Sequence, residues 1–192
     1  MQKLLITAVL FVVGLWTWNE YFRAIPHLAQ PGVLKNFVIQ PIAKHEVTYT
    51  VIDQHFASAQ RRMVYPTTTS SMMGGFNDLV YVSNIDVLLT IQATVPDYAL
   101  QYDEVRRCYF SPELSDNQRQ HAQANTVHYS LIAKNEQIAN QIRRLKAGQK
   151  VMLSGELVEV SYQKTGKRFF VGVGSSFASN CQIFQVNEIR VY

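Results

Sequence analysis

The sequence predicts an α+β, β-rich protein, in which a small antiparallel β domain with two helices follows an N-terminal helix. The 192 residues include ten Tyr and ten Phe, and aromatic and β-branched residues favour strands. Apolar or alternating runs recur along the chain, whereas helix start signals appear at only two places after the N-terminal segment. A chain of this length buries one substantial core, so we expect one domain plus an N-terminal segment.

Residues 1–23 predict a membrane-anchor helix. The run from Leu4 to Trp18 carries no charge, and no small-x-small cleavage site follows it closely. Aromatic residues of the kind that line a membrane interface close the segment: Trp16, Trp18, Tyr21 and Phe22. We therefore expect residues 1–23 to bind membrane lipid as a single-pass signal-anchor in the inner (cytoplasmic) membrane. A short N-terminus before a large domain favours a periplasmic C-terminal domain. Secretion after signal-peptide cleavage is the alternative.

The rest of the chain divides into a tether and a globular domain. Pro26, Pro31 and Pro41 interrupt residues 24–44, which predicts an extended tether that partly packs down. Residues 45–192 form the predicted β-rich domain. Within it, the small, polar, glycine-ended stretch at 66–77 predicts a mobile loop.

The first predicted strands lie at 45–53 and 79–95. Residues 45–53 alternate apolar and polar side chains, which is typical of a half-buried strand. Residues 79–95 carry the strongest β signal, and Asn84 and Asp86 predict either a break into two strands or a bulge.

Two helices and a terminal β unit follow. Ser111-Pro112-Glu113 predicts a helix that runs to about Ala124, and Asn135 caps a second helix that ends near Gly148. The next strand, 151–160, is expected to bend near Gly155. A turn, a returning strand at 168–174 and a final strand at 181–192 complete the pattern. Curved strands in this arrangement predict an OB-like or barrel-like domain.

Residues from about 85 to 192 carry three further sequence features. They are Asn125-Thr-Val-His128-Tyr-Ser-Leu-Ile132-Ala133, the segment Gly148 to Val160, and Ser175-Ser176 followed by Cys181-Gln182. With these features the segment resembles an uncharacterised family of bacterial membrane-anchored proteins with a C-terminal OB-like β domain. This chain has an extra residue between Asn125 and His128 and no proline before Ala133. The resemblance implies a fold for the C-terminal part and no activity.

Two cysteines, Cys108 and Cys181, are too far apart for a CxxC redox or zinc motif. Either they pair in a disulfide or both are structurally inert. Outside the cytoplasm, a disulfide closing a loop of this length contributes roughly 4 kcal/mol in the chain-entropy model.

Candidate catalytic residues are few. A thiol or serine hydrolase could use Cys181 or Ser176 as the nucleophile and His128 as the base. No GxSxG elbow surrounds Ser176, no HExxH motif appears, and no phosphate-binding glycine loop is present. His121 and His128 would share a face only if one helix ran through both. We therefore expect neither a metal nor a cofactor, and the balance leans against an enzyme.

Basic residues concentrate between the second helix and the following hairpin: Arg143, Arg144, Lys146, Lys150, Lys164, Lys167 and Arg168. This composition suits an OB-type single-strand binder, an acidic lipid or protein partner, or a solvated helix end and hairpin. The formal net charge of +4 is mild, so nucleic acid is not the expected partner.

The combined features predict a non-enzymatic, extracytoplasmic binding or scaffold module within a cell-envelope complex. Its expected partners are membrane lipid through residues 1–23 and an envelope protein. The sequence does not indicate a small-molecule substrate.

Overall fold

The computed structural model describes residues 2–21, 25–57, 79–92, 100–104, 106–110, 114–172 and 181–192. The β-rich α+β class and the mostly antiparallel sheet agree with the prediction. The loop predicted at 66–77 lies outside the described residues.

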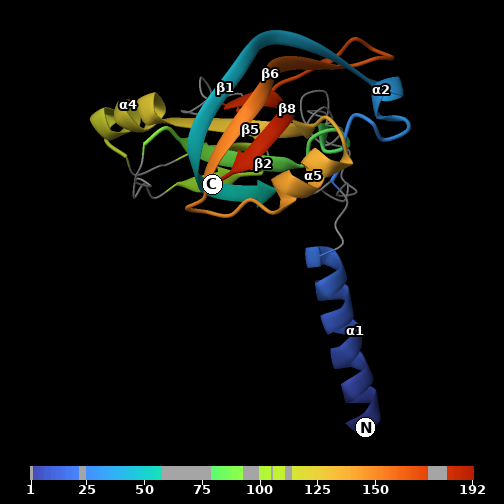
Figure 1. Cartoon of the computed structure of the whole chain (residues 1–192). Helices are drawn as coiled ribbons and strands as arrows, with labels where there is room; N and C mark the ends of the chain where they lie inside the picture. Colours follow the sequence, from blue (N-terminus) through green and yellow to red (C-terminus); the bar gives the residue numbers. More distant parts are fainter. Residues whose placement is uncertain are drawn as a thin grey trace, which may run out of the picture.

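Helix α1, Gln2–Tyr21, extends away from the β-rich part of the chain (Figure 1). The predicted helix is therefore present. Nine of its apolar residues, between Leu4 and Leu15, are more than half exposed. In the described part of the chain, no helix has both the length and the apolar character needed to cross a membrane. The side chains of Trp16, Trp18, Tyr21 and Phe22 lie outside the described residues.

Six strands form the main sheet: β1 (Phe37–Phe56), β2 (Ile85–Thr90), β5 (Thr126–Ala133), β6 (Lys150–Tyr162), β7 (Arg168–Phe169) and β8 (Cys181–Val191). Their order is β1-β2-β5-β8-β6-β7, and β1 also pairs with β6. The hydrogen-bonded ladder through β1, β2, β5, β8 and β6 therefore returns to β1. Pairing is antiparallel throughout this ladder except between β5 and β8, which run parallel.

Strand β1 is much longer than the predicted strand at 45–53. Residues 37–44, predicted as tether, belong to β1 and pair with β6. The tether prediction is wrong there, because a proline usually interrupts a strand but does not do so at this position. The structure instead places Pro41 beside a register shift, where the missing N–H is tolerated. Upstream, α2 (Val33–Asn36) and a bridge from His27 to Ala133 hold the chain against the domain.

Strand β2 begins directly after Asn84 and runs through Asp86, so the predicted break into two strands, or bulge, is not found there. The residues before it form a hydrogen-bonded turn, in which the Val82 amide donates to the Leu79 carbonyl. The side chains of Leu79 and Val82 are fully buried. Residues 79–84 were therefore wrongly predicted as strand, because a buried apolar turn and a buried strand are indistinguishable over so few residues.

The two predicted helices are present with shifted ends. Helix α4, Asp116–Asn125, is capped by Ser115, whose side chain forms a capping box with Gln118. The predicted cap at Ser111 lies outside the described residues. Helix α5, Glu136–Arg143, is capped by Asn135 as predicted, but it ends before Gly148, which occupies a later turn.

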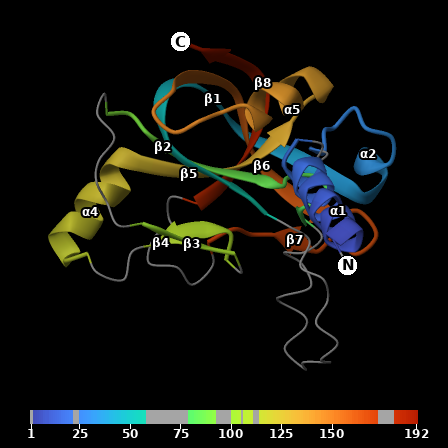
Figure 2. The same ribbon diagram turned by 90° about the horizontal axis from the view of Figure 1, so that it is seen from below.

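A short hairpin, β3 (Gln101–Asp103) and β4 (Cys108–Phe110), was not predicted. Three-residue strands are too short to show periodicity. Figure 2 shows this hairpin as a separate layer beside the main sheet, near β7.

Two apolar clusters form the core. The first lies within the ring of paired strands and is closed by Ile138, Ala139 and Ile142 of α5. The second lies on the other face of β5, β6 and β8, and contains Cys108 of the hairpin and Ala122 of α4. The insertion between β2 and β5 thus covers the sheet from outside.

Gly155 marks the predicted bend of β6. The register between β6 and β8 shifts between Ser154 and Gly155, and a Cβ on Gly155 would lie 2.0 Å from the Gln185 carbonyl oxygen. We expect Gly155→Ala to lower the free energy of unfolding by about 2–3 kcal/mol or more, because the backbones must separate. Urea unfolding measures this loss. Gly14→Ala, where a Cβ meets no atom within 4 Å, is the control, and equal stability of the two variants would contradict the expectation.

Candidate functional site

The candidate site lies on the outer face of β1, β2, β5 and β8. Strand register aligns side chains there in two rows. One row contains His55, Asp86 and Ser130; the neighbouring row contains Asp53, Leu88, His128 and Cys181. Because alternate residues of a strand share a face, each polar residue of β2 and β5 in these rows points away from the first core and toward the β3–β4 hairpin.

Asp86 is the centre of the first row. Its side chain is fully buried and forms a bidentate ion pair with Arg107. The Arg107 Nε donates to one carboxylate oxygen at 2.9 Å, and Nη2 donates to the other at 2.7 Å. Ser130 and Tyr102 also donate hydrogen bonds to this carboxylate. Arg107 donates further to the Ser83 carbonyl at 2.8 Å. The network ties the hairpin to β2 and β5.

The charges in this network stabilise each other. Burial alone would raise the pKa of the Asp86 carboxyl, but the Arg107 guanidinium and the hydrogen-bond donors lower it below its usual value. Burial and the Asp86 charge raise the pKa of Tyr102, which stays protonated and donates. Arg107 has a φ of 52°, uncommon for a residue other than glycine, and the buried ion pair holds it there.

Aromatic rings cover the two rows. His55 stacks on Tyr102 with ring centroids 3.8 Å apart, and Tyr102 meets Tyr109 edge-on. Tyr109 in turn meets His128 edge-on and donates a hydrogen bond to Asp53 at 2.9 Å. Hairpin side chains thus span the face from β1 to β5.

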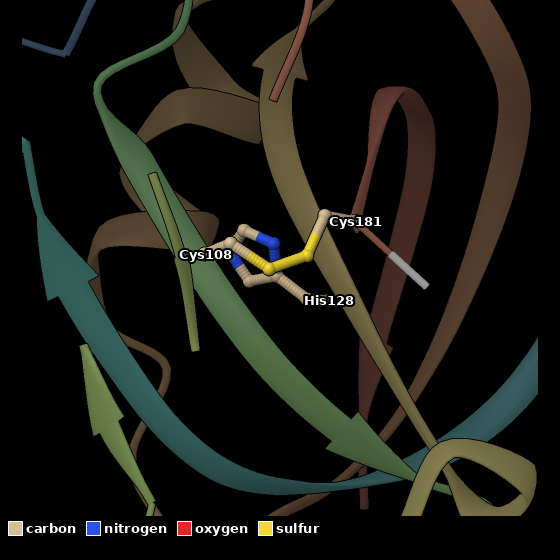
Figure 3. A group of neighbouring side chains, drawn as sticks. All are labelled: Cys108, His128 and Cys181. Carbon is tan, nitrogen blue, oxygen red and sulfur yellow. A yellow bond between two sulfur atoms is a disulfide. The ribbon is translucent and has the colours of Figure 1, made fainter. Parts of the chain in front are cut away.

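The second row ends at a disulfide. Cys108, the first residue of β4, is bonded to Cys181, the first residue of β8, with Cα atoms 6.0 Å apart. Figure 3 shows the imidazole of His128 beside this bond. The structure therefore brings Cys181 and His128 together, but Cys181 has no thiol to act as a nucleophile in this state. The thiol-hydrolase hypothesis has no support from this arrangement.

His128 is buried and uncharged. Its side chain is 2% exposed, and among the described residues neither ring nitrogen has a hydrogen-bond partner. Burial lowers the pKa of His128 to about 4; the Asp86 charge opposes this shift and the Arg107 charge adds to it. A histidine in this environment cannot exchange protons with solvent as a general base normally does.

The buried His128 predicts acid sensitivity of the disulfide-bonded protein. In the unfolded chain the imidazole accepts a proton near pH 6.5, whereas in the folded protein it does so only near pH 4. The unfolded state therefore binds more protons between these values, and stability falls as the pH falls. The expected loss approaches about 3 kcal/mol at pH 4.

Urea unfolding at intervals from pH 7.5 to 4 measures the slope. His128→Gln should flatten it, and His121→Gln, on the exposed face of α4, should not. The stability that the ionised Asp86 carboxylate contributes is lost only at lower pH, below the usual pKa of an aspartate. The effects of Asp86 and His128 on stability can therefore be separated by pH. Equal slopes for the wild type and His128→Gln would show that another group is responsible.

The predicted basic region divides into two groups. Arg143, Arg144, Lys146 and Lys150 lie at the end of α5 and the start of β6, and Lys164, Lys167 and Arg168 lie in the β6–β7 hairpin. The two groups lie at opposite ends of β6, whose first residue is Lys150. Arg168 forms an ion pair with Glu159 at 3.1 Å. The structure thus does not place these cations in one patch.

Two candidates remain, His121 and Ser176. His121 lies in α4 and His128 in β5, so no helix runs through both. Ser176 lies outside the described residues.

Sequence reasoning missed Asp86 and Arg107 as a pair. The available signal was a lone acid within the apolar run 85–90, since a charge inside a buried strand requires a partner.

Comparisons with protein families, with curated proteins and with solved structures found no match to this chain.

Proposed function

We propose that this chain is a non-enzymatic binding or scaffold module held at a membrane by residues 1–23. The observation that carries the proposal is the exposed apolar surface of α1. Apolar residues around the helix from Leu4 to Leu15 are 51–78% exposed. Soluble helices bury such a surface, and membrane lipid is the partner that we propose covers it. The aromatic residues at its end suit a membrane interface.

We further propose that the β domain lies outside the cytoplasm, in the periplasm of a bacterial cell. The Cys108–Cys181 disulfide supports this location, because disulfides persist in oxidising compartments and are rare in the cytosol. An envelope protein is then the expected partner.

An OB-like barrel is the architecture we infer for the domain. Support comes from the ladder of strands that returns to β1, the parallel contact of β5 with β8, and helix α5 between β5 and β6. In OB domains the second and third strands form the usual face for oligonucleotides. Here the equivalent face, on β2 and β5, carries buried Asp86 and is covered by Tyr102 and Tyr109. This cover and the divided basic residues argue against nucleic-acid binding and favour a protein partner at another surface.

Three experiments test the proposal. The full-length protein should fractionate with membranes and resist alkaline carbonate washing, and a reporter fused after Tyr192 should be active only in the periplasm. Co-purification in mild detergent should then recover an envelope protein with the chain. A matched variant that carries Leu5→Asp, Val9→Asp and Val12→Asp should lose membrane association. A cytoplasmic reporter signal, an unchanged distribution of this variant, or recovery of the chain alone would contradict the proposal.

A further inference from the structure

Cys108, His128 and Cys181 form a group of three potential metal ligands. The two Sγ atoms and a ring nitrogen of His128 lie within 4.8 Å of one another, and all three residues are buried. They come from strands β4, β5 and β8, so the fold of the whole domain holds them together (Figure 3).

His128 is the unusual member of this group. Within the described part of the chain, its two ring nitrogens lack hydrogen-bond partners although the side chain is almost fully buried. Leaving such a group unsatisfied destabilises the folded protein. In the neighbouring row, by contrast, Asp86 has four donor groups around it. A buried polar group without partners calls for an explanation. One explanation is that the imidazole is a ligand for a metal ion.

We propose that reduction of the Cys108–Cys181 disulfide converts this group into a Zn²⁺ site with two sulfur ligands and one imidazole ligand. A dithiol reductant, R(SH)₂, supplies two electrons and two protons: it gives the two cysteine thiols and is oxidised to its cyclic disulfide. Binding of Zn²⁺ then displaces one proton from each thiol. In the oxidised state both sulfurs are held in the S–S bond, and thiolates are the form that binds metal, so the disulfide closes the site.

The geometry requires only small movements. Zn–S bonds of about 2.3 Å and Zn–N bonds of about 2.0–2.1 Å place tetrahedral ligand atoms roughly 3.3–3.8 Å apart. The Cα separation of 6.0 Å leaves room for both sulfurs to turn toward a common ion. Gly172 borders the group: a Cβ there would lie 2.9 Å from the Cys181 sulfur and 3.3 Å from the Cys108 sulfur. A side chain at this position would therefore crowd the sulfurs.

Of the three ligand residues, Cys181 also borders a cavity, which is the side from which we infer that a fourth ligand would approach. Cys181 lines a cavity of about 280 Å³, together with Glu159 of β6, Phe169 of β7 and Ile183 of β8. Three protein ligands and one accessible position are typical of zinc sites that retain a water or an exchangeable ligand. Two thiolates and an imidazole select thiophilic ions over Mg²⁺ or Ca²⁺.

The test uses the full-length protein in detergent. The disulfide is reduced with a phosphine, the excess is removed without oxygen, and Zn²⁺ is titrated against a chromophoric chelator. We expect one Zn²⁺ per reduced chain and none per oxidised chain. His128→Gln should weaken binding at least about tenfold, whereas His121→Gln should bind as the wild type does. X-ray absorption of the zinc-loaded wild type should show two sulfur ligands and one imidazole nitrogen.

Several results would overturn the proposal. They are equal Zn²⁺ binding by reduced and oxidised protein, equal binding by His128→Gln and the wild type, and a zinc shell without imidazole. If His128→Gln does not fold, the wild-type absorption spectrum decides alone. Reduced protein that unfolds and is not restored by Zn²⁺ would likewise show that the pair is a structural disulfide only. Cu⁺ binding without Zn²⁺ binding would reject the assigned ion.

Discussion

Cys108→Ala combined with Cys181→Ala is expected to lower the free energy of unfolding by about 4 kcal/mol. The bond joins residues separated by 73 positions, and its loss gives the unfolded chain much more conformational freedom. The double substitution also removes the covalent link between β4 and the start of β8. The hairpin keeps one backbone hydrogen bond to the chain that follows β7, in which the Gly172 amide donates to the Arg106 carbonyl at 2.7 Å. Urea unfolding at pH 7.5 measures the change.

Reduction of the wild type in the presence of a metal chelator is the matched control. It breaks the same bond without removing any side chain, so it should cost nearly as much as the double substitution. A loss below about 1 kcal/mol in both experiments would show that the hairpin and β8 hold together without the bond.

Asp86→Asn is expected to lower the free energy of unfolding by about 3–5 kcal/mol. The substitution leaves the Arg107 guanidinium buried at 2% exposure without its negative partner. The β3–β4 hairpin should loosen first, because the contacts of Arg107 and Tyr102 with Asp86 connect it to the sheet. Hydrogen exchange of the hairpin amides, together with urea unfolding, measures both effects.

Arg106→Gln provides the control on the same hairpin. Arg106 pairs with Asp103 at 2.8 Å, but its side chain is 47% exposed, so its loss should cost less than about 1 kcal/mol. Arg107→Met should be as damaging as Asp86→Asn, and the double variant should cost less than the sum of the two. Additive losses, or equal effects of Asp86→Asn and Arg106→Gln, would mean that the buried pair is not coupled.

Both expectations concern the layer that the insertion between β2 and β5 adds to the sheet. In the OB-like barrel that we propose, the outer face of β2 and β5 corresponds to the surface that OB domains leave open to a ligand. Here Tyr102, Tyr109 and Arg107 occupy it, and the disulfide secures them. This cover is the structural reason to look for a partner surface elsewhere, and it also creates the buried environment of His128.

Local features of the sequence were enough to predict many elements. Asn135 and the apolar spacing that follows it predict α5, because a cap and a 3.6-residue period are encoded within a few neighbouring residues. The bend of β6 at Gly155 is equally local. The sequence does not predict the start of β1, because a proline such as Pro41 usually lies at the end of a strand. It does not predict β3 and β4, because three residues are too few to show an alternation of apolar and polar side chains.

The N-terminal segment is local in the same way, because its apolar run predicts the helix α1; its association with a membrane and the location of the β domain are proposals. By itself, the sequence determined the β-rich class and most of the elements. Only the tertiary structure decided that Asp86 pairs with Arg107, that Cys108 is bonded to Cys181, and that His128 lies beside both sulfurs. The physical reason is that these contacts depend on strand register across 20 to 73 positions, and a shift of one residue would turn every side chain to the opposite face.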